Sequence, residues 1–354
     1  MSCLVVPSQE GSKAPGPVPG PLWPVGSLGV AIGVSWGMSG ASMEIRLRHA
    51  EMHIHKPAEP ATATVVKNEA CTAGKKAAGF VRHIELDLSG TGLVGKCIPG
   101  QSLGILAPGV DGNGRPHKPR LYSLASPTRG EDGHGAVHAL TVKRLIDENP
   151  ADNSLFLGVA SNYLCGLGVG SKVQVSGPSG KRFVLPVDAG AHDFVFIATG
   201  TGIAPFRGML MDLFAAGYKG EITLIMGSPY ATDLLYHGQL AQLAQEHANF
   251  HYRTAISREA NAPHGKMYVQ DRLAAEWPVL ESQFASGRAL VYICGIAGME
   301  LGVFQQLARA LGPGVLEQYL ELDPEAAGNI DGWTRAMIHR QVRPTRRVFL
   351  EVYA

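Results

Sequence analysis

The sequence predicts two domains, an antiparallel β-barrel followed by a domain with a parallel sheet and helices on both of its faces. Residues 55 to 187 contain short apolar segments broken by Gly, Pro and Asp, which is typical of antiparallel β-structure. Residues 193 to 354 alternate apolar strands with helical stretches, a pattern that favours a parallel sheet. The length of 354 residues also favours two domains over one.

Individual elements follow from the local patterns. The period-two segment 80–88 and the segment 139–142 predict strands of the barrel. In the second domain, strands are predicted at 194–198, 222–226 and 290–294, and helices at 204–213, 234–247 and 299–311. Residues 187–192 contain Gly and Asp and are the predicted linker.

Residues 1–54 precede this pattern and are rich in Pro and Gly up to about residue 40. Two interpretations stay open, a disordered leader and a mis-assigned start with translation beginning near Met43. The apolar run 25–36 is too short and too rich in glycine for a membrane helix, and only Lys13 is basic upstream of it. We therefore expect no integral membrane segment.

Charge and cysteine content exclude several classes. Lys and Arg total 31 against 30 Asp and Glu, so the chain lacks the overall basic field of a nucleic-acid-binding protein. The five cysteines show no CxxC spacing, which argues against a local iron–sulfur or zinc site. An odd count without a paired pattern argues against a secreted disulfide scaffold. We expect a cytoplasmic protein without a metal.

The segment 194–207 predicts a buried strand, a glycine-rich turn and the start of a helix. Gly200 and Gly202 would let the backbone approach an anion, and Pro205 suits the first turn of a helix. Free N–H groups at the helix start favour a pyrophosphate. A tight turn without a ligand is the alternative.

Three segments of the barrel half carry groups suited to a flavin. Arg120 can bind a diphosphate, Tyr122 can cover an isoalloxazine ring, and the Ser123 hydroxyl can bond a flavin nitrogen. Residues 141–144 predict a strand with exposed cations. Residues 158–164 predict a turn and a short helix with Ser161 as its N-cap. An edge strand with a solvated arginine is the alternative for the first segment.

In this order, the motifs Arg-x-Tyr-Ser, Val-Lys-Arg, Gly-Val-x-Ser-Asn, Gly-Pro-x-Gly-Lys, Gly-Thr-Gly-Ile-Ala-Pro-Phe-Arg and Cys-Gly resemble the plant-type ferredoxin–NADP+ reductase family. The similarity extends from about Lys56 to Tyr353. The resemblance implies an FAD-binding β-barrel followed by a Rossmann-like NADP-binding domain. It also implies a flavoenzyme that transfers electrons between NADP(H) and ferredoxin or flavodoxin through FAD.

The resemblance also implies the site residues. Those for FAD are Arg120, Leu121, Tyr122, Ser123, Thr141, Val142, Lys143, Val159, Ala160, Ser161, Thr201 and Tyr353. Those for NADP are Lys143, Thr201, Ser228, Pro229, Ser257, Arg258, Lys266, Tyr268, Gln270, Gly295, Ile296 and Glu351. Hydroxyl and cationic groups suit a 2′-phosphate, and a tyrosine offers adenine a flat face; a solvated basic loop is the alternative.

Four residues are implied in catalysis: Ser123, Cys294, Glu351 and Tyr353. Cys294 ends a predicted strand where ligands of parallel sheets sit, although a buried strand cysteine is usually only core. Glu351 resembles the family's carboxylate beside the nicotinamide, and Tyr353 resembles the aromatic residue that covers the flavin and must move aside.

Three features depart from the family. Asp147 stands where plant enzymes have a tyrosine that stacks on the FAD adenine, so we expect adenine to be held differently or loosely. Ala354 extends the chain past the terminal tyrosine, and an insertion at 324–335 precedes the tail.

Without a metal centre, a one-electron acceptor has to be a separate protein. Residues 335–347 contain five arginines and His339 just before the tail, and we expect them to attract an acidic ferredoxin or flavodoxin to the flavin. A solvated basic helix is the alternative. Two further functions stay open: a reductase component of an oxygenase or similar complex, and a catalytically silent flavin- or NADP-binding regulator.

Overall fold

A computed structural model describes residues 45–72, 80–149, 151–260 and 264–353. The described residues belong to one compact unit, Glu44–Ala354. Most of the predicted leader, with Met43 and the apolar run 25–36, lies outside the described residues, as does Ala354. No helix of the described part is long and apolar enough to cross a membrane.

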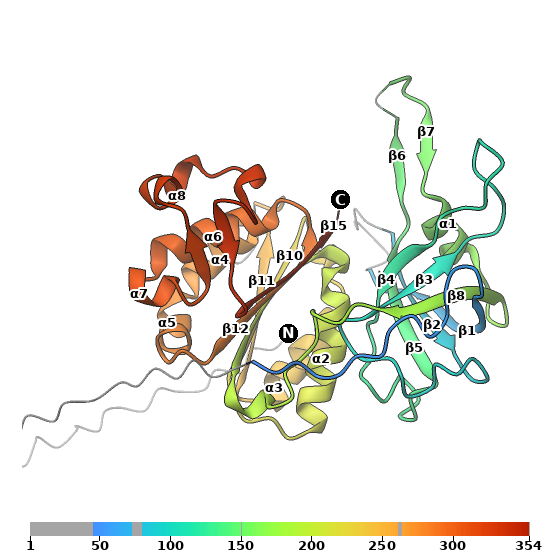
Figure 1. The fold of residues 1–354 in the computed structure, drawn as a ribbon, viewed down its shortest axis with the longest axis horizontal. Helices are drawn as coiled ribbons and strands as arrows, with labels where there is room; N and C mark the ends of the chain where they lie inside the picture. Colours follow the sequence, from blue (N-terminus) through green and yellow to red (C-terminus); the bar gives the residue numbers. More distant parts are fainter. Residues whose placement is uncertain (1–44, 73–79, 150, 261–263, 354) are drawn as a thin grey trace, which may run out of the picture. The chain divides into compact units, whose positions relative to one another are not determined.

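The first half forms the predicted antiparallel barrel (Figure 1). Its strands are β1 (Ala61–Ala70), β2 (Val81–Asp87), β3 (Ser102–Leu106), β4 (Arg120–Ser123), β5 (Val137–Lys143) and β8 (Lys172–Ser179). Their order is β4-β3-β8-β1-β2-β5. The sheet closes where Ala125 N–H donates to the Ala139 carbonyl at 2.8 Å, beside a bridge between Leu124 and Leu140. Alternate residues such as Ile84 and Leu86 fill the interior, as period-two alternation requires.

A two-stranded hairpin and a short helix follow β5. The hairpin consists of β6 (Ile146–Glu148) and β7 (Leu155–Leu157), and it projects away from the barrel strands (Figure 1). The helix is α1 (Val159–Gly166).

The second half forms the predicted parallel sheet. Its strands are β9 (Asp193–Thr199), β10 (Ile222–Ser228), β11 (Phe250–Ile256), β12 (Ala289–Ile296) and β15 (Val348–Tyr353), in the order β11-β10-β9-β12-β15. Neighbouring strands are parallel throughout. The sheet therefore has one carboxyl edge, where a ligand site is expected.

Helices cover both faces of this sheet. They are α2 (Ile203–Ala215), α3 (His237–Glu246), α4 (Val269–Ala275), α5 (Trp277–Ala285) and α6 (Met299–Ala310). Phe194 and Phe196 of β9 pack in the core with α2 and α3, whereas Val195 and Ile197 pack with α4, α5 and α6. The fold class predicted from the sequence is confirmed.

Shorter elements complete the chain. They are η1 (Ala189–Ala191), η2 (Gly200–Gly202), η3 (Ala231–Asp233), α7 (Pro313–Leu316), β13 (Leu320–Leu322), α8 (Pro324–Gly328), η4 (Ile330–Gly332), η5 (Arg335–Met337) and β14 (Val342–Pro344). The insertion 324–335 thus holds α8 and η4, and Trp333 anchors it because its ring is buried and its Nε1–H donates to the Ala326 carbonyl at 2.8 Å.

Residues 45–54, which the predicted leader included, contact both halves. Arg48 N–H donates to the Leu185 carbonyl at 3.0 Å, and the Arg48 guanidinium lies 3.2 Å from the Asp212 carboxylate of α2. The limits of the two domains stay a prediction.

Candidate active site

Four predicted site residues meet at the carboxyl edge of the parallel sheet. Cys294 of β12 lies opposite Glu351 of β15, and the same register brings Tyr353 opposite Ile296. The Tyr353 hydroxyl is hydrogen-bonded to Thr201 Oγ1 at 2.6 Å. The parallel register and this hydrogen bond therefore bring the glycine turn, Cys294 and the C-terminal strand close together.

Burial shifts the protonation of both inner groups. The pKa of Glu351 is raised to about 7 by burial, and its Oε2 has no hydrogen-bond partner among the described residues. The pKa of the Cys294 thiol is raised by its burial and then by the nearby Glu351 charge. The thiol is therefore neutral near pH 7, and Glu351 is poised to exchange a proton there.

The glycine turn is shaped by close contact with the backbone of β12. A Cβ at Gly202 would lie 2.1 Å from the Cys294 carbonyl oxygen, so only glycine lets the turn approach β12. Gly200 has a φ of +53° and open space where a Cβ would be. No described side chain caps α2. The Ile203 N–H donates to the Gly200 and Thr201 carbonyls of the preceding η2 turn, and Pro205 has no N–H to offer.

Thr199 is a functional residue that the sequence analysis missed. Its hydroxyl accepts from Ile296 N–H at 2.9 Å, and it would lie 2.1 Å from a Cβ at Gly295, whose φ is +152°. Thr199 thus fixes the backbone of Gly295 and Ile296. Its place as the last residue before the glycine turn was the available signal.

The expected flavin residues of β4 and β5 differ in exposure. Arg120 and Leu121 are exposed, while Tyr122 and Ser123 are half-buried and extend the same strand. Burial raises the pKa of Tyr122 to about 12. In β5, Thr141 and Val142 are buried and Lys143 is exposed. Of these three side chains, only that of Lys143 is accessible to a ligand.

The glycine turn lies against this part of the barrel. Ala204, in the first turn of α2, packs with Ala125 and Ala139 in a small buried cluster. The turn and strand β5 are therefore neighbours.

The prediction that Ser161 caps α1 is wrong. The N-cap is Gly158, and Ser161 lies inside the first turn, where its hydroxyl donates to the Gly158 carbonyl at 3.2 Å and accepts from Leu145 N–H at 3.1 Å. The helix begins earlier because Val159 and Ala160 already adopt helical geometry. With Gly158 as cap, no side chain occupies the first N–H groups, which leaves them free for a phosphate.

The expected nucleotide residues gather beyond β10 and β11. Ser257 N–H donates to the Ser228 carbonyl at 3.0 Å, and Arg258 N–H donates to the Pro229 carbonyl at 2.9 Å. Lys266 and Tyr268 follow on the loop that Met267 N–H ties to Ile256. Arg258, Lys266 and Tyr268 are exposed, and Ser228 Oγ is buried without a partner among the described residues. Gln270 of α4 packs against Gly302 of α6.

Phe156 is a second residue that the sequence analysis missed. It lies directly opposite Asp147 on the hairpin, so the two side chains share one face. The ring is 50% exposed, and the apolar side chains of Ile146, Leu155 and Leu157 are exposed beside it. The hairpin thus has an aromatic ring on β7, on the strand paired with that of Asp147.

The arginines of 335–347, which we expect to attract an acidic carrier, do not lie together at the carboxyl edge of the sheet. Strand β15 runs parallel to β12 and begins at Val348, so Arg346 and Arg347 lie at the amino edge, about 20–23 Å along the chain from Tyr353. Arg343 is paired with Asp323 at 2.8 Å and with Glu321 at 3.5 Å, and Arg335 is paired with Glu300 at 3.3 Å.

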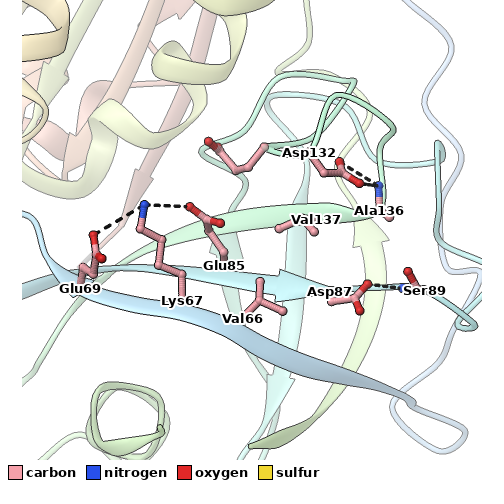
Figure 2. Close-up of a pocket in the computed structure, with 10 residues that line it drawn as sticks. Val66, Lys67, Glu69, Glu85, Asp87, Ser89, Asp132, Ala136 and Val137 are labelled. Atoms are coloured by element: carbon pink, nitrogen blue, oxygen red, sulfur yellow. Dashed lines mark hydrogen bonds and ion pairs between the residues drawn. The ribbon is translucent and has the colours of Figure 1, made fainter. Parts of the chain in front are cut away.

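One group among the described residues could hold a metal ion: His83, Glu85 and Glu131. Arg207 already binds Glu131 at 2.6 Å, and Lys67 lies 3.3 Å from Glu85. Figure 2 shows this Lys67 between Glu85 and Glu69 in the neighbouring pocket. The Arg207 and Lys67 side chains thus already neutralise these carboxylates. The absence of a metal remains a prediction.

The fold and the sites define a class. A closed antiparallel barrel whose strand β5 lies against the glycine turn of a parallel nucleotide-binding sheet is the arrangement of the flavoprotein reductases. Residues 196–304 match the model of the oxidoreductase NAD-binding domain.

Sequence comparison gives the particular family. The ferredoxin–NADP reductase of Spirulina is 39% identical over 268 residues, which cover 74% of this chain and 90% of that protein. The ferredoxin–NADP reductase of Synechocystis is 36% identical over 309 residues, covering 85% of this chain and 70% of the relative. The chloroplastic leaf isozyme 1 of Oryza sativa is 39% identical over 259 residues, covering 70% of this chain and 69% of that protein. The chain belongs to the ferredoxin–NADP reductase family.

A solved structure agrees on the fold. The ferredoxin–NADP+ reductase of Plasmodium falciparum superposes with a TM-score of 0.63, covering 85% of this chain and 99% of its own at 23% identity.

Proposed function

We propose that this chain binds FAD and NADP(H) and transfers electrons between NADP(H) and a ferredoxin or flavodoxin. The observation that carries the proposal is the meeting of Thr201, Cys294, Glu351 and Tyr353 at the carboxyl edge of the sheet, beside the glycine turn that packs against β5. The relatives named ferredoxin–NADP reductase support the same activity.

In this proposal the barrel holds FAD. Arg120 and the uncapped start of α1 bind the diphosphate, and Tyr122 and Ser123 contact the ring. Further contacts to FAD come from the segments Thr141–Lys143 and Val159–Ser161. Phe156 offers the adenine the stacking face that Asp147 lacks. Leu121 shields the cofactor's edge because its side chain is exposed beside Arg120.

The nucleotide loops hold NADP(H). Arg258 and Lys266 neutralise the 2′-phosphate, and Ser257 donates a hydroxyl hydrogen bond to it. Tyr268, which is 62% exposed, stacks on the adenine, while the buried Ser228 Oγ and Gln270 supply further polar contacts. The backbone of Gly295 and Ile296, fixed by Thr199, positions the nicotinamide end.

FAD, when bound, accepts two electrons from NADPH and releases them singly. The protein's part is to orient and shield. Tyr353 covers the flavin face until the nicotinamide replaces it, and its hydroxyl bond to Thr201 holds the covering position. Cys294 lines the reacting spot as a neutral thiol, and Glu351 holds a proton there near pH 7.

In this proposal the carrier docks on the barrel and not on the arginine segment 335–347. Lys118 and Arg115 are exposed on the loop before β4, and Lys143 is exposed at the end of β5. These cations flank the strands that hold the flavin, so they can attract an acidic protein to its edge.

We also propose the cytoplasm as the compartment, on the unpaired cysteine pattern. Cell fractionation checks it, since some relatives are named chloroplastic.

The test begins with the purified chain's visible spectrum and with acid release and chromatography of the chromophore. FAD, reduction of the flavin by NADPH in preference to NADH, and NADPH-dependent reduction of an added acidic ferredoxin are expected. Cys294→Ala and Glu351→Ala should keep FAD and slow its reduction by at least about tenfold, because their transition-state contacts are lost. A colourless chain that takes up no FAD, or a flavin that NADPH does not reduce, would exclude the proposed activity.

A further inference from the structure

Tyr236 belongs to none of the expected site residues, yet it contacts both halves of the chain. It lies between η3 and α3 in the nucleotide half. Its hydroxyl is hydrogen-bonded at 2.6 Å to Thr141 Oγ1 of β5 and at 3.0 Å to His83 Nδ1 of β2. One side chain from the nucleotide half therefore bonds two strands of the barrel.

The backbone of Tyr236 is held in an unfavourable conformation. Its φ is +55°, in the left-handed region that aromatic residues rarely adopt. Such a conformation persists only where the surroundings determine it strongly, and it is often found at functional positions. Here the guanidinium carbon of Arg207 lies 5.1 Å from the centre of the tyrosine ring.

Both ends of this contact continue into the proposed cofactor sites. The segment that begins at Ser228 and Pro229, which are proposed to touch NADP, leads through η3 to Tyr236. On the other side, Thr141 is followed directly by Val142 and Lys143, which are proposed to hold FAD. The Tyr236–Thr141 hydrogen bond is thus connected through short segments of chain to both proposed cofactor sites.

We propose that Tyr236 is a positioning residue for electron transfer between the two cofactors. Its hydroxyl holds strand β5 against the nucleotide loop, so that the nicotinamide and the flavin meet at a reactive distance. The inference rests on the proposed function. Reacting groups must lie about 3–3.5 Å apart, and small misplacements are costly in rate.

Other contacts hold the two halves together without Tyr236. Arg207 binds both oxygens of Glu131, at 2.6 and 3.1 Å, and donates to the Ala125 carbonyl at 2.9 Å. Asp212 accepts from Thr128 N–H at 2.9 Å. Because these contacts stay, removing one hydroxyl should leave the fold and both binding sites intact.

The test compares wild type, Tyr236→Phe and a matched control, Tyr252→Phe. The Tyr252 hydroxyl also bonds a histidine, His237 Nδ1 at 3.1 Å, but both partners belong to the nucleotide half. Single-turnover reduction of the bound FAD by NADPH is followed by stopped-flow. FAD content and the NADP+ dissociation constant are measured beside it.

Reduction should be about three- to tenfold slower in Tyr236→Phe, the usual effect of one lost hydrogen bond, with both affinities within about twofold of wild type. Tyr252→Phe should behave as wild type. Thr141→Val should be as slow as Tyr236→Phe, and the double variant should be no slower than either single one.

An unchanged rate in Tyr236→Phe overturns the inference, and so does a slow rate that accompanies loss of FAD, which would assign the hydroxyl a structural role. If NADPH fails to reduce the flavin even in wild type, the proposed function fails first.

Discussion

Replacing Glu351 with glutamine should remove a pH-dependent decrease in the free energy of unfolding that the buried carboxyl causes when it ionises. Its pKa is raised from 4.5 to about 7 by burial. The folded chain therefore binds this proton more tightly than the unfolded chain does. Stability from this group is fully present below pH 4.5, falls as the pH rises towards 7, and is constant above that. Above pH 7 the cost reaches about 3 kcal/mol.

The assay is urea unfolding of wild type and Glu351→Gln at pH 5 and at pH 8. The burial cost of the glutamine amide does not depend on pH, so only the carboxyl changes the difference between the two proteins. That difference should shift by about 2–3 kcal/mol in favour of the variant between pH 5 and pH 8. Flavin release and far-UV circular dichroism should report the same transition, which checks two-state behaviour.

Histidines also titrate in this range but cancel in the comparison. Burial lowers the pKa of His83, His138 and His192, so acid destabilises wild type and variant alike. A stability difference that is equal at pH 5 and pH 8 would mean that Glu351 titrates normally in the folded chain, contrary to the prediction.

Four further predictions concern the cofactors and the carrier. Arg258→Ala should lower kcat/KM for NADPH about tenfold to a hundredfold and spare NADH, because a charge-assisted phosphate contact is lost; equal use of both coenzymes by wild type would contradict it. Tyr353→Ser should tighten NADP+ binding and relax discrimination against NADH in equilibrium titrations, since no ring has to be displaced; unchanged affinities would count against a covering role. Phe156→Ala should weaken FAD binding by about 1–3 kcal/mol, a typical value for base stacking, as measured by flavin fluorescence; full retention would place the adenine elsewhere. Lys118→Glu should slow ferredoxin-dependent cytochrome reduction at low salt while Arg346→Glu should not; the reverse result would restore the arginine segment as the docking surface.

The local part of the structure was predictable from the sequence. The strand 194–198, the glycine turn and the helix 204–213 were predicted, and they correspond to β9, η2 and α2. Period-two and helical patterns depend on neighbours in the chain, so they survive without tertiary information. The N-cap of α1 was misplaced because the observed cap, Gly158, has no side chain to signal it and lies three positions before the predicted cap, Ser161.

Contacts between distant residues were not predictable in this way. His83 and Tyr236 are separated by 153 positions, and Tyr236 and Thr141 by 95. Nothing in the local pattern around Leu234 and Leu235 distinguishes the following tyrosine from an ordinary helix residue. Its role becomes visible only when α3 and the barrel strands are packed together. Phe156 was missed for a related reason, since its pairing with Asp147 depends on the register of the hairpin.

Strand direction decides which of the expected residues lie close together in space. Cys294 and Glu351 meet because β12 and β15 are parallel and both end at the carboxyl edge. The same direction carries Arg346 and Arg347 to the opposite edge, although only a few residues separate them from Tyr353. Each residue of an extended strand adds roughly 3.3 Å, so residues that are near in sequence can lie far apart in space. The docking surface that we propose for an acidic carrier is therefore assembled from exposed cations beside β4 and β5, such as Lys118 and Lys143, and not from this segment.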